Sequence, residues 1–245
     1  MATPRFFCPI PLAVRQTIAL PDNVAHHASR ALRMREGDDI ILFDGKRGQY
    51  HAKLRFQNGK AMAEILLFDE QEHELQGKIT LVQGLPSGDK MDWIIEKTSE
   101  LGVQQLVPVQ AERSILNLSG PRLEKRQAHW QKVAISASEQ CGRNQVQQIA
   151  PLQTLEQFMK TGAGFQHMLL CHPEGGVNLL AYLQQQENIT DLCLLVGPEG
   201  GWSDRELKLL QEKGAQRVTY GSRVLRTETA GIALTAACTA VLNWI

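Results

Sequence analysis

The sequence predicts two domains in tandem, a small β-barrel followed by an α/β domain. Three observations support this. Short strand candidates separated by hairpin turns fill residues 17–68, an acidic polar stretch follows them, and beyond it strands alternate with helices, as in βαβ architecture. A chain of 245 residues suits one large domain or two smaller ones, and either choice buries enough apolar surface for a stable core.

The N-terminal barrel is predicted from four short strand candidates. These are Thr17–Leu20, Asp39–Phe43, Tyr50–Leu54 and Ala61–Leu66. The turn signals Asp44-Gly45 and Asn58-Gly59 separate the later ones, as in hairpins. One helix is expected to interrupt the strands over Val24–Met34, because apolar residues recur there at helical spacing before Gly37.

The stretch Asp69–Gly77 is predicted to be the linker between the two domains. It is polar and acidic and contains no β-branched residue, so neither a strand nor a buried helix is favoured. We place the domain boundary inside it, which predicts domains over residues 1–72 and 73–245.

Five strand candidates and four helices are expected in the second domain. The strands are Ile79–Gln83, Leu106–Val109, Met168–Cys171, Leu192–Val196 and Arg217–Tyr220, and the helices are Trp93–Leu101, Leu123–Cys141, a helix from a Ser203/Glu206 capping box to Gly214, and Thr229–Trp244. Met168–Cys171 and Leu192–Val196 are apolar enough for the middle of a parallel sheet. The last helix is apolar on nearly all sides, so its own domain or a second subunit must cover it.

Composition narrows the class of protein. The formal net charge is zero, which argues against a protein that coats nucleic acid, although residues 1–60 carry ten Lys or Arg against five acids. A solvated surface explains that excess equally well. Five scattered cysteines without a CxxC pair indicate a reducing cytosol, and no signal peptide or membrane-spanning run is recognised. The histidines show no metal-ligand spacing, so we expect no metal site. Together with the cysteine pattern and the lack of a recognised signal peptide or membrane-spanning run, this predicts a cytoplasmic protein without membrane contact.

Two loops of the second domain are candidates for ligand contact. Gly197–Gly201 joins an apolar strand to a capped helix, where ligands of open α/β sheets meet the strand ends. Gly221–Ala230 packs two arginines and a glutamate before the last helix. A plain turn explains the first loop, and a salt-bridged helix cap between Arg226 and Glu228 explains the second. Two such loops after two strands nevertheless favour a shared pocket.

Other catalytic patterns are absent or weaker. There is no Walker loop, GxGxxG fingerprint or GxSxG elbow, and neither Cys141 nor Cys171 has a partner pattern for nucleophilic catalysis. The polar cluster Ser138–Asn144 lies where an amphipathic helix should end, and Gly142 with Asn144 explains that ending without any function. Hydrolase chemistry is therefore disfavoured.

Taken together, these segments resemble the RsmE family of ribosomal RNA small-subunit methyltransferases, within the SPOUT superfamily. The matching motifs keep their order and spacing along nearly the whole chain: Pro4–Phe7, His27 with Arg30–Met34 and Gly37, Glu96-Lys97 with Glu100–Val103, Glu139–Asn144, Gly197–Gly201, and Arg223–Thr229. The resemblance implies a PUA-like barrel that binds RNA, an α/β domain with a deep trefoil knot, and a homodimer. It also implies methylation of N3 of a uridine in 16S ribosomal RNA, within the assembled 30S subunit, by S-adenosylmethionine.

The resemblance also assigns site residues. The residues expected around S-adenosylmethionine are Leu170, Cys171, His172, Val196, Gly197, Pro198, Glu199, Gly200, Gly201, Tyr220, Gly221, Val224, Leu225 and Thr229. Arg226 is expected to stabilise charge on a uracil oxygen, Glu228 to orient Arg226 or act as a base, and Arg143 to reach a phosphate or the base. The barrel residues expected to contact RNA are Arg5, Arg30, Arg33, Arg35, Lys46 and Arg47.

Three alternatives remain open at the level of sequence. The chain can be an enzyme of this fold that acts on another RNA, such as transfer RNA. It can be a non-catalytic RNA-binding factor in ribosome assembly, although the intact motifs at Gly197–Gly201 and Arg226–Glu228 count against that. On pattern alone it can also be an enzyme that binds a nucleotide phosphate at the glycine loop.

Overall fold

The computed structural model describes residues 3–161 and 164–245. Its contacts divide the described chain into two compact units. The N-terminal unit contains the residues up to Glu74 together with Ser138–Val146, and the C-terminal unit contains Leu75–Ala137 and the residues from Gln147 to the end. The N-terminal unit therefore includes a segment that lies far along the chain, beyond the predicted linker.

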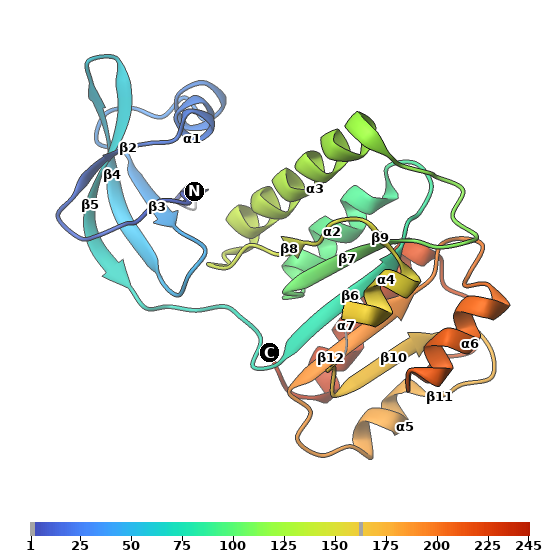
Figure 1. The fold of residues 1–245 in the computed structure, drawn as a ribbon. Helices are drawn as coiled ribbons and strands as arrows, with labels where there is room; N and C mark the ends of the chain where they lie inside the picture. Colours follow the sequence, from blue (N-terminus) through green and yellow to red (C-terminus); the bar gives the residue numbers. More distant parts are fainter. Residues whose placement is uncertain (1–2, 162–163) are drawn as a thin grey trace. The chain divides into compact units, whose positions relative to one another are not determined.

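A five-stranded sheet forms the N-terminal unit (Figure 1). Its strands are β1 (Arg5–Phe7), β2 (Thr17–Ala19), β3 (Asp39–Phe43), β4 (Gln49–Gln57) and β5 (Lys60–Asp69). Their order is β1-β3-β4-β5-β2; β1 runs parallel to β3, and the other neighbours are antiparallel. The four predicted strands are confirmed. β1 adds a fifth strand that its length of three residues hid from the sequence pattern.

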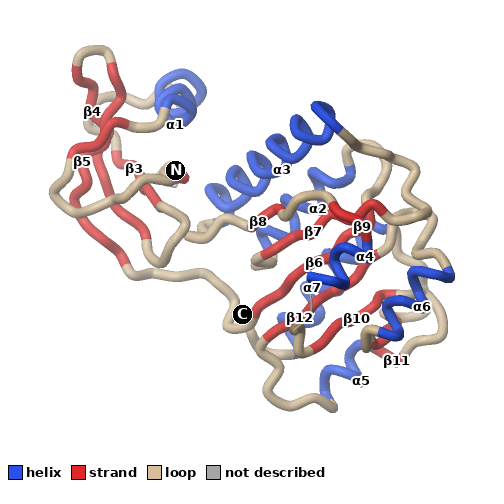
Figure 2. Tube along the Cα trace, viewed as in Figure 1, coloured by secondary structure: helices blue, strands red, loops and turns tan. Residues whose placement is uncertain are grey.

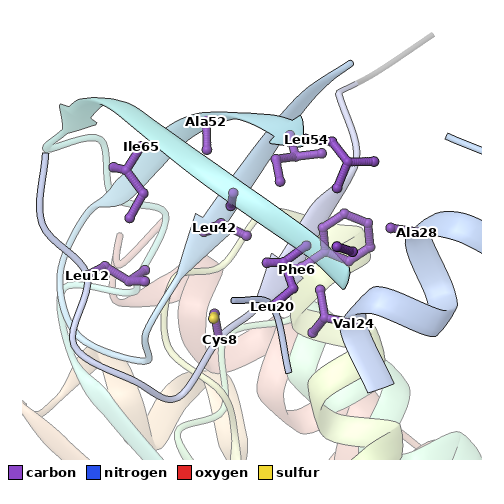
Figure 3. Packing of buried hydrophobic residues seen from close by; sticks show 13 residues of the cluster. Phe6, Cys8, Leu12, Leu20, Val24, Ala28, Leu42, Ala52, Leu54 and Ile65 are labelled. Carbon is purple, nitrogen blue, oxygen red and sulfur yellow. The ribbon is translucent and has the colours of Figure 1, made fainter. Parts of the chain in front are cut away.

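The core of the N-terminal unit follows the alternation of its strands. Ala52 and Leu54 on β4 and Ala63 and Ile65 on β5 are buried at every second position, since side chains of a strand alternate between faces. They pack with further buried apolar residues from β1, β3 and the helical segment, which Figure 3 shows around Phe6, Leu42, Val24 and Ala28. This cluster is the hydrophobic core of the unit.

The predicted helix over Val24–Met34 is wrong in its extent. The chain forms α1 (Asp22–His26) and then a π-helical turn, η1 (His27–Ala31). Leu32 N donates to His27 O at 3.0 Å and Met34 N donates to Ala28 O at 3.0 Å, while Arg33 takes a positive φ of 52°. This closure satisfies the last carbonyls of the helix, so the helix stops before it reaches Gly37.

An eight-stranded parallel sheet forms the C-terminal unit. Its order is β11-β13-β10-β12-β6-β7-β8, and β9 also pairs with β7. The strands are β6 (Lys78–Gly84), β7 (Gln105–Gln110), β8 (Gln148–Ile149), β9 (Gln153–Thr154), β10 (His167–Cys171), β11 (Val177–Asn178), β12 (Asp191–Val196) and β13 (Gln216–Thr219). β10 and β12 lie inside the sheet, as their apolar sequences predict.

Helices cover both faces of this sheet (Figure 2). They are α2 (Lys90–Glu100), α3 (Gly120–Cys141), α4 (Leu155–Thr161), α5 (Leu179–Gln184), α6 (Asp204–Glu212) and α7 (Thr227–Val241). Residues of α4 and α6 pack with Val82, Val107 and Leu195 on one face, while α7 contacts α2, α5, β6 and β12 on the other. No helix of residues 3–161 and 164–245 combines the length and apolar character that a membrane span requires.

Two predicted helix features can be compared with the structure directly. The capping box is confirmed, since Glu206 N donates to Ser203 Oγ at 3.1 Å and Ser203 N donates to Glu206 Oε2 at 2.8 Å. The last helix begins at Thr227, two residues before the predicted start. Its inner face is buried within its own unit, and Gly231 packs against Leu81, where an added Cβ would approach Leu81 Cδ2 to 3.1 Å.

The two ends of the predicted linker are anchored, each to a different unit. Asn144 Nδ2 donates to Gln71 O at 2.7 Å in the N-terminal unit. Gln76 N donates to Trp244 O at 3.1 Å in the C-terminal unit. These two bonds use the backbone of the stretch, and one of its acidic side chains is engaged as well, since Glu74 Oε2 accepts from Arg143 Nη2 at 2.7 Å.

Candidate active site

A cavity of about 750 Å³ lies in the C-terminal unit, at the carboxyl ends of β10, β12 and β13. Its walls come from the glycine loop, which we define as Gly197–Gly201 after β12, from the arginine loop, defined as Tyr220–Arg226 after β13, and from residues 171–173 after β10. Because carboxyl ends of parallel strands meet at one edge of a sheet, the fold brings these loops together.

Most residues predicted to hold the cofactor line this cavity. Twelve of the fourteen do so: Cys171, His172, Val196, Gly197, Pro198, Glu199, Gly200, Gly201, Tyr220, Gly221, Val224 and Leu225. Arg226 and Glu228 also line it. Leu170 is instead a core residue with 2% exposure, and Thr229 is an exposed residue in the first turn of α7; neither is among the lining residues.

Close packing of backbone gives the glycine loop its shape. Gly201 has a positive φ of 68°, a conformation that glycine adopts without steric cost. Gly84, at the end of β6, lies so close that an added Cβ would be 2.5 Å from Pro198 N. A Cβ added at Gly200 would be 3.0 Å from Arg113 Cβ. The glycines therefore leave room for neighbouring protein segments as well as for a ligand.

Two polar side chains tie the glycine loop to the last helix. Thr227 Oγ1 donates to Gly197 O at 2.6 Å and accepts from Gln83 Nε2 at 2.8 Å. Gln83 has 0% exposure and follows the buried apolar residues Leu81 and Val82 near the end of β6. The sequence analysis missed both residues, although one glutamine at the end of an apolar run is a detectable signal, because a buried amide requires partners.

The predicted ion pair between Arg226 and Glu228 is wrong. Among the described residues, Glu228 has its ion pair with Lys90, whose Nζ lies 3.8 Å from Glu228 Oε2. That oxygen is buried and has no hydrogen-bond partner. Arg226 is the N-cap residue of α7 and makes no side-chain capping bond. Both side chains line the cavity and are therefore available to a ligand.

Glu199 is the most strongly held acid of the cavity. Its Oε1 accepts from Lys90 Nζ at 2.6 Å and from Ser87 Oγ at 2.7 Å. Burial alone would raise the pKa of Glu199, but the hydrogen bonds from Lys90 and Ser87 outweigh burial and lower the pKa to about 2. The sequence analysis missed Lys90, which lies more than a hundred positions before its partner.

This pKa predicts how the stability of the C-terminal unit depends on acid. Since the pKa of Glu199 falls from 4.5 to about 2 on folding, its ionised form contributes stability above pH 4.5, and that contribution is lost as the pH falls toward 2. Glu199→Gln is therefore expected to lose less thermal stability than the wild type across this window. Thermal unfolding midpoints of both proteins, measured at several pH values across this window, test the prediction. If the midpoint fell equally in both proteins, the prediction would be contradicted.

Comparison with known proteins identifies the family. A family model described as an RNA methyltransferase domain matches residues 73–239, and a second, an RNA methyltransferase PUA domain, matches residues 20–60. A relative from Bacillus subtilis named ribosomal RNA small subunit methyltransferase E is 31% identical over 224 residues, covering 87% of this chain and 86% of the relative. The chain belongs to the RsmE family.

Two solved structures of high similarity extend this comparison. A ribosomal RNA small subunit methyltransferase E from Neisseria gonorrhoeae, bound to S-adenosylmethionine, is 38% identical with a TM-score of 0.89 and 98% coverage of both chains. A methyltransferase from Legionella pneumophila, in complex with the same cofactor, is 31% identical with a TM-score of 0.90 and 98% coverage of both chains. The RsmE family motifs thus occur here together with the matching fold.

Arg143, which the RsmE motifs suggested as a third site residue, lies in the N-terminal unit. It is 2% exposed, and its Nη2 lies 2.7 Å from Glu74 Oε2 of the same unit. It is not among the residues that line the cavity. The structure therefore brings Arg226 and Glu228 together and places Arg143 in a buried ion pair.

Five of the six predicted RNA-contact residues are exposed: Arg30, Arg33, Arg35, Lys46 and Arg47. Arg5 differs, since it is partly buried and its Nη2 donates to Gly142 O at 3.0 Å and to Asn144 Oδ1 at 2.9 Å. Burial also lowers the pKa of Arg5. Its guanidinium holds the segment Ser138–Val146 within the N-terminal unit, a contact that no local pattern predicts.

The cavity offers neither a reactive thiol nor a metal site in the described part of the chain. Burial raises the pKa of Cys171 to about 11, so the thiol stays protonated at neutral pH. Among residues 3–161 and 164–245 no three His, Cys, Asp or Glu side chains are grouped closely enough to hold a metal ion. The polar side chains that line the cavity are its arginines, lysine and carboxylates together with His172, Tyr220 and Thr227.

Proposed function

We propose that this protein is an S-adenosylmethionine-dependent methyltransferase that methylates N3 of one uridine in 16S ribosomal RNA. One observation carries the proposal: the cavity at the strand ends is lined by both Arg226 and Glu228, two positions apart at the start of the last helix. The relative from Bacillus subtilis is named a small-subunit ribosomal RNA methyltransferase, and the Neisseria gonorrhoeae relative was solved with S-adenosylmethionine.

The cavity fits the cofactor in size and lining. Its volume of about 750 Å³ lies within the range of ordinary small-molecule sites. The glycine loop and the arginine loop offer backbone groups, while Leu207, Leu225 and Ala230 offer apolar surface for an adenine ring. When bound, S-adenosylmethionine supplies a methyl group on a positively charged sulfur.

The charge around the cavity suits an RNA substrate. Five cationic side chains line it against three acidic ones: Lys90, Arg113, Arg217, Arg223 and Arg226 against Glu199, Asp204 and Glu228. All three acids have cationic partners, since Glu199 and Glu228 pair with Lys90 and Asp204 lies 3.8 Å from Arg113 Nη2. The surplus of positive charge favours phosphate, even though the whole chain has no net charge.

Two residues are proposed to act on the uracil. N3 carries a hydrogen at neutral pH, and the Glu228 carboxylate, which lines the cavity, accepts that hydrogen as a hydrogen bond and then as a proton. Arg226 stabilises the negative charge that develops on a uracil oxygen when N3 loses its proton. The sequence left Glu228 either to orient Arg226 or to act as a base; because its ion pair is with Lys90 and not with Arg226, we propose the acceptor role.

We further propose the finer features of architecture that the family implies. The N-terminal unit is a PUA-like barrel that contacts RNA, and residues 1–72 and 73–245 are the RNA-binding and methyltransferase domains. The strand order supports a trefoil knot in the C-terminal unit. α7 is the helix that follows β13, yet Thr227 at its start bonds Gly197 after β12 and Gln83 on β6. In the sheet, β12 and β6 lie two and three strands away from β13.

We also propose a homodimer, formed in the cytoplasm where ribosomes assemble. It would cover Ile245, which is 82% exposed.

The decisive experiment is transfer of labelled methyl groups to purified ribosomal subunits. Small subunits from cells that lack this protein are incubated with the enzyme and labelled S-adenosylmethionine, and the modified base is mapped. Label at N3 of a single uridine in 16S RNA supports the proposal. Naked 16S RNA and transfer RNA run in parallel; label on transfer RNA alone, or on no RNA, would overturn the substrate.

A further inference from the structure

Lys90 occupies a position that local helix energetics disfavour. It is the first residue of α2, where the helix dipole places positive partial charge and where acidic side chains are favoured. Its N-cap residue, Asp89, makes no side-chain capping bond. A cation at this end of a helix therefore requires a stabilising contact from outside the helix.

Two carboxylates from distant parts of the chain provide that contact. Lys90 Nζ lies 2.6 Å from Glu199 Oε1 in the glycine loop and 3.8 Å from Glu228 Oε2 in the first turn of α7. The first contact is a short charge-assisted hydrogen bond. The second is too long for a hydrogen bond, so it leaves Glu228 Oε2 attracted but unbonded.

All three side chains line the cavity and are largely withdrawn from solvent. Their side chains are 32% exposed for Lys90, 26% for Glu199 and 17% for Glu228. The hydrogen bond to Glu199 also raises the pKa of Lys90, so the ammonium keeps its charge. One cation thus sits between the loop proposed to hold the cofactor and the acid proposed to accept the substrate proton.

We propose that Lys90 is a positioning residue for methyl transfer, which fixes the glycine loop through Glu199 and holds the Glu228 carboxylate in place at the wall of the cavity. This inference rests on the proposed function. Lys90 touches neither the base nor the methyl group; it acts through the two carboxylates. Its ammonium bonds Glu199 directly and stays 3.8 Å from Glu228 Oε2, so it attracts the Glu228 carboxylate without a direct hydrogen bond.

The test compares Lys90→Met and Lys90→Arg with a matched control, Lys97→Met. Lys97 lies on the same helix and also bridges two glutamates, Glu96 and Glu100, at 2.7 Å each, but it does not line the cavity. For each variant, kcat and KM for small subunits, the Kd of S-adenosylmethionine and the thermal midpoint are measured. These four quantities separate positioning from folding and from cofactor binding.

Lys90→Met is expected to lower kcat by roughly tenfold or more while KM changes by less than about threefold. The Kd of S-adenosylmethionine is expected to rise, because the glycine loop loses its anchor, but by a smaller factor than kcat falls. Lys90→Arg is expected to recover most of that loss, since it restores a cation, and Lys97→Met to resemble the wild type. An unchanged kcat in Lys90→Met, or no recovery in Lys90→Arg, would overturn the role of Lys90 alone. A wild type that labels no ribosomal RNA would overturn the proposed function, and this inference with it.

Discussion

Replacing Arg226 by alanine is expected to lower kcat for methylation of small subunits by about 100-fold to 1,000-fold, the usual cost of removing one charge-stabilising donor. Arg226 lines the cavity, and among the described residues no ion pair engages it. Its charge is therefore free to act on the substrate. Because the glycine loop and the arginine loop are proposed to contact the cofactor mainly through backbone groups, the Kd of S-adenosylmethionine is expected to change by less than about threefold.

The control for this prediction is Arg205→Ala. Arg205 is a 76% exposed residue of α6 that pairs with Glu112 and Glu156 and does not line the cavity. Single-turnover transfer of labelled methyl, together with titration of S-adenosylmethionine, measures both quantities. If Arg226→Ala kept the wild-type kcat, or if it lost cofactor binding in proportion to kcat, the assigned role of Arg226 would be wrong.

Replacing Arg143 by alanine is expected to destabilise the N-terminal unit by about 3–5 kcal/mol, because it leaves the carboxylate of Glu74 buried and unpaired. Arg143 is 3% exposed at its side chain and Glu74 is 12% exposed. Arg143 Nε also donates to both oxygens of Glu74 at 3.1 Å. When Arg143 is removed from this buried, bidentate pair, water does not replace the hydrogen bonds that Glu74 loses.

Hydrogen exchange of the amides in β3, β4 and β5 measures this effect within the N-terminal unit. The control is Arg55→Ala, which breaks an exposed pair with Glu64 in the same unit, where Arg55 is 36% exposed. Ion pairs between solvent-exposed side chains contribute little to stability, so this variant is expected to exchange almost like the wild type. Unchanged exchange in Arg143→Ala together with a large loss of kcat would restore the catalytic role that the sequence suggested for Arg143.

The extent of sequence-based prediction differs between the two units. In the C-terminal unit, β10 and β12 were predicted because buried parallel strands are continuously apolar, and the capping box at Ser203 because its bonds span three residues. In the N-terminal unit the helix end was misplaced. The helix ends where Arg33 adopts a left-handed backbone conformation, whereas the sequence prediction relied on Gly37, because glycine is the commoner residue at helix ends.

The sequence by itself determined the longer strands and helices, the two loops that border the cavity, and membership of the RsmE family, because each rests on residues close together in the chain; it missed the short elements β1, β8, β9, β11, α4 and α5. Only the tertiary structure decided the partners of the charged groups. Lys90 meets Glu199 and Glu228, and Arg143 meets Glu74, across long sequence separations. Attraction between opposite charges depends on their distance in space and not on their separation in sequence. The fold of the backbone sets these distances, so it decides which charged groups pair.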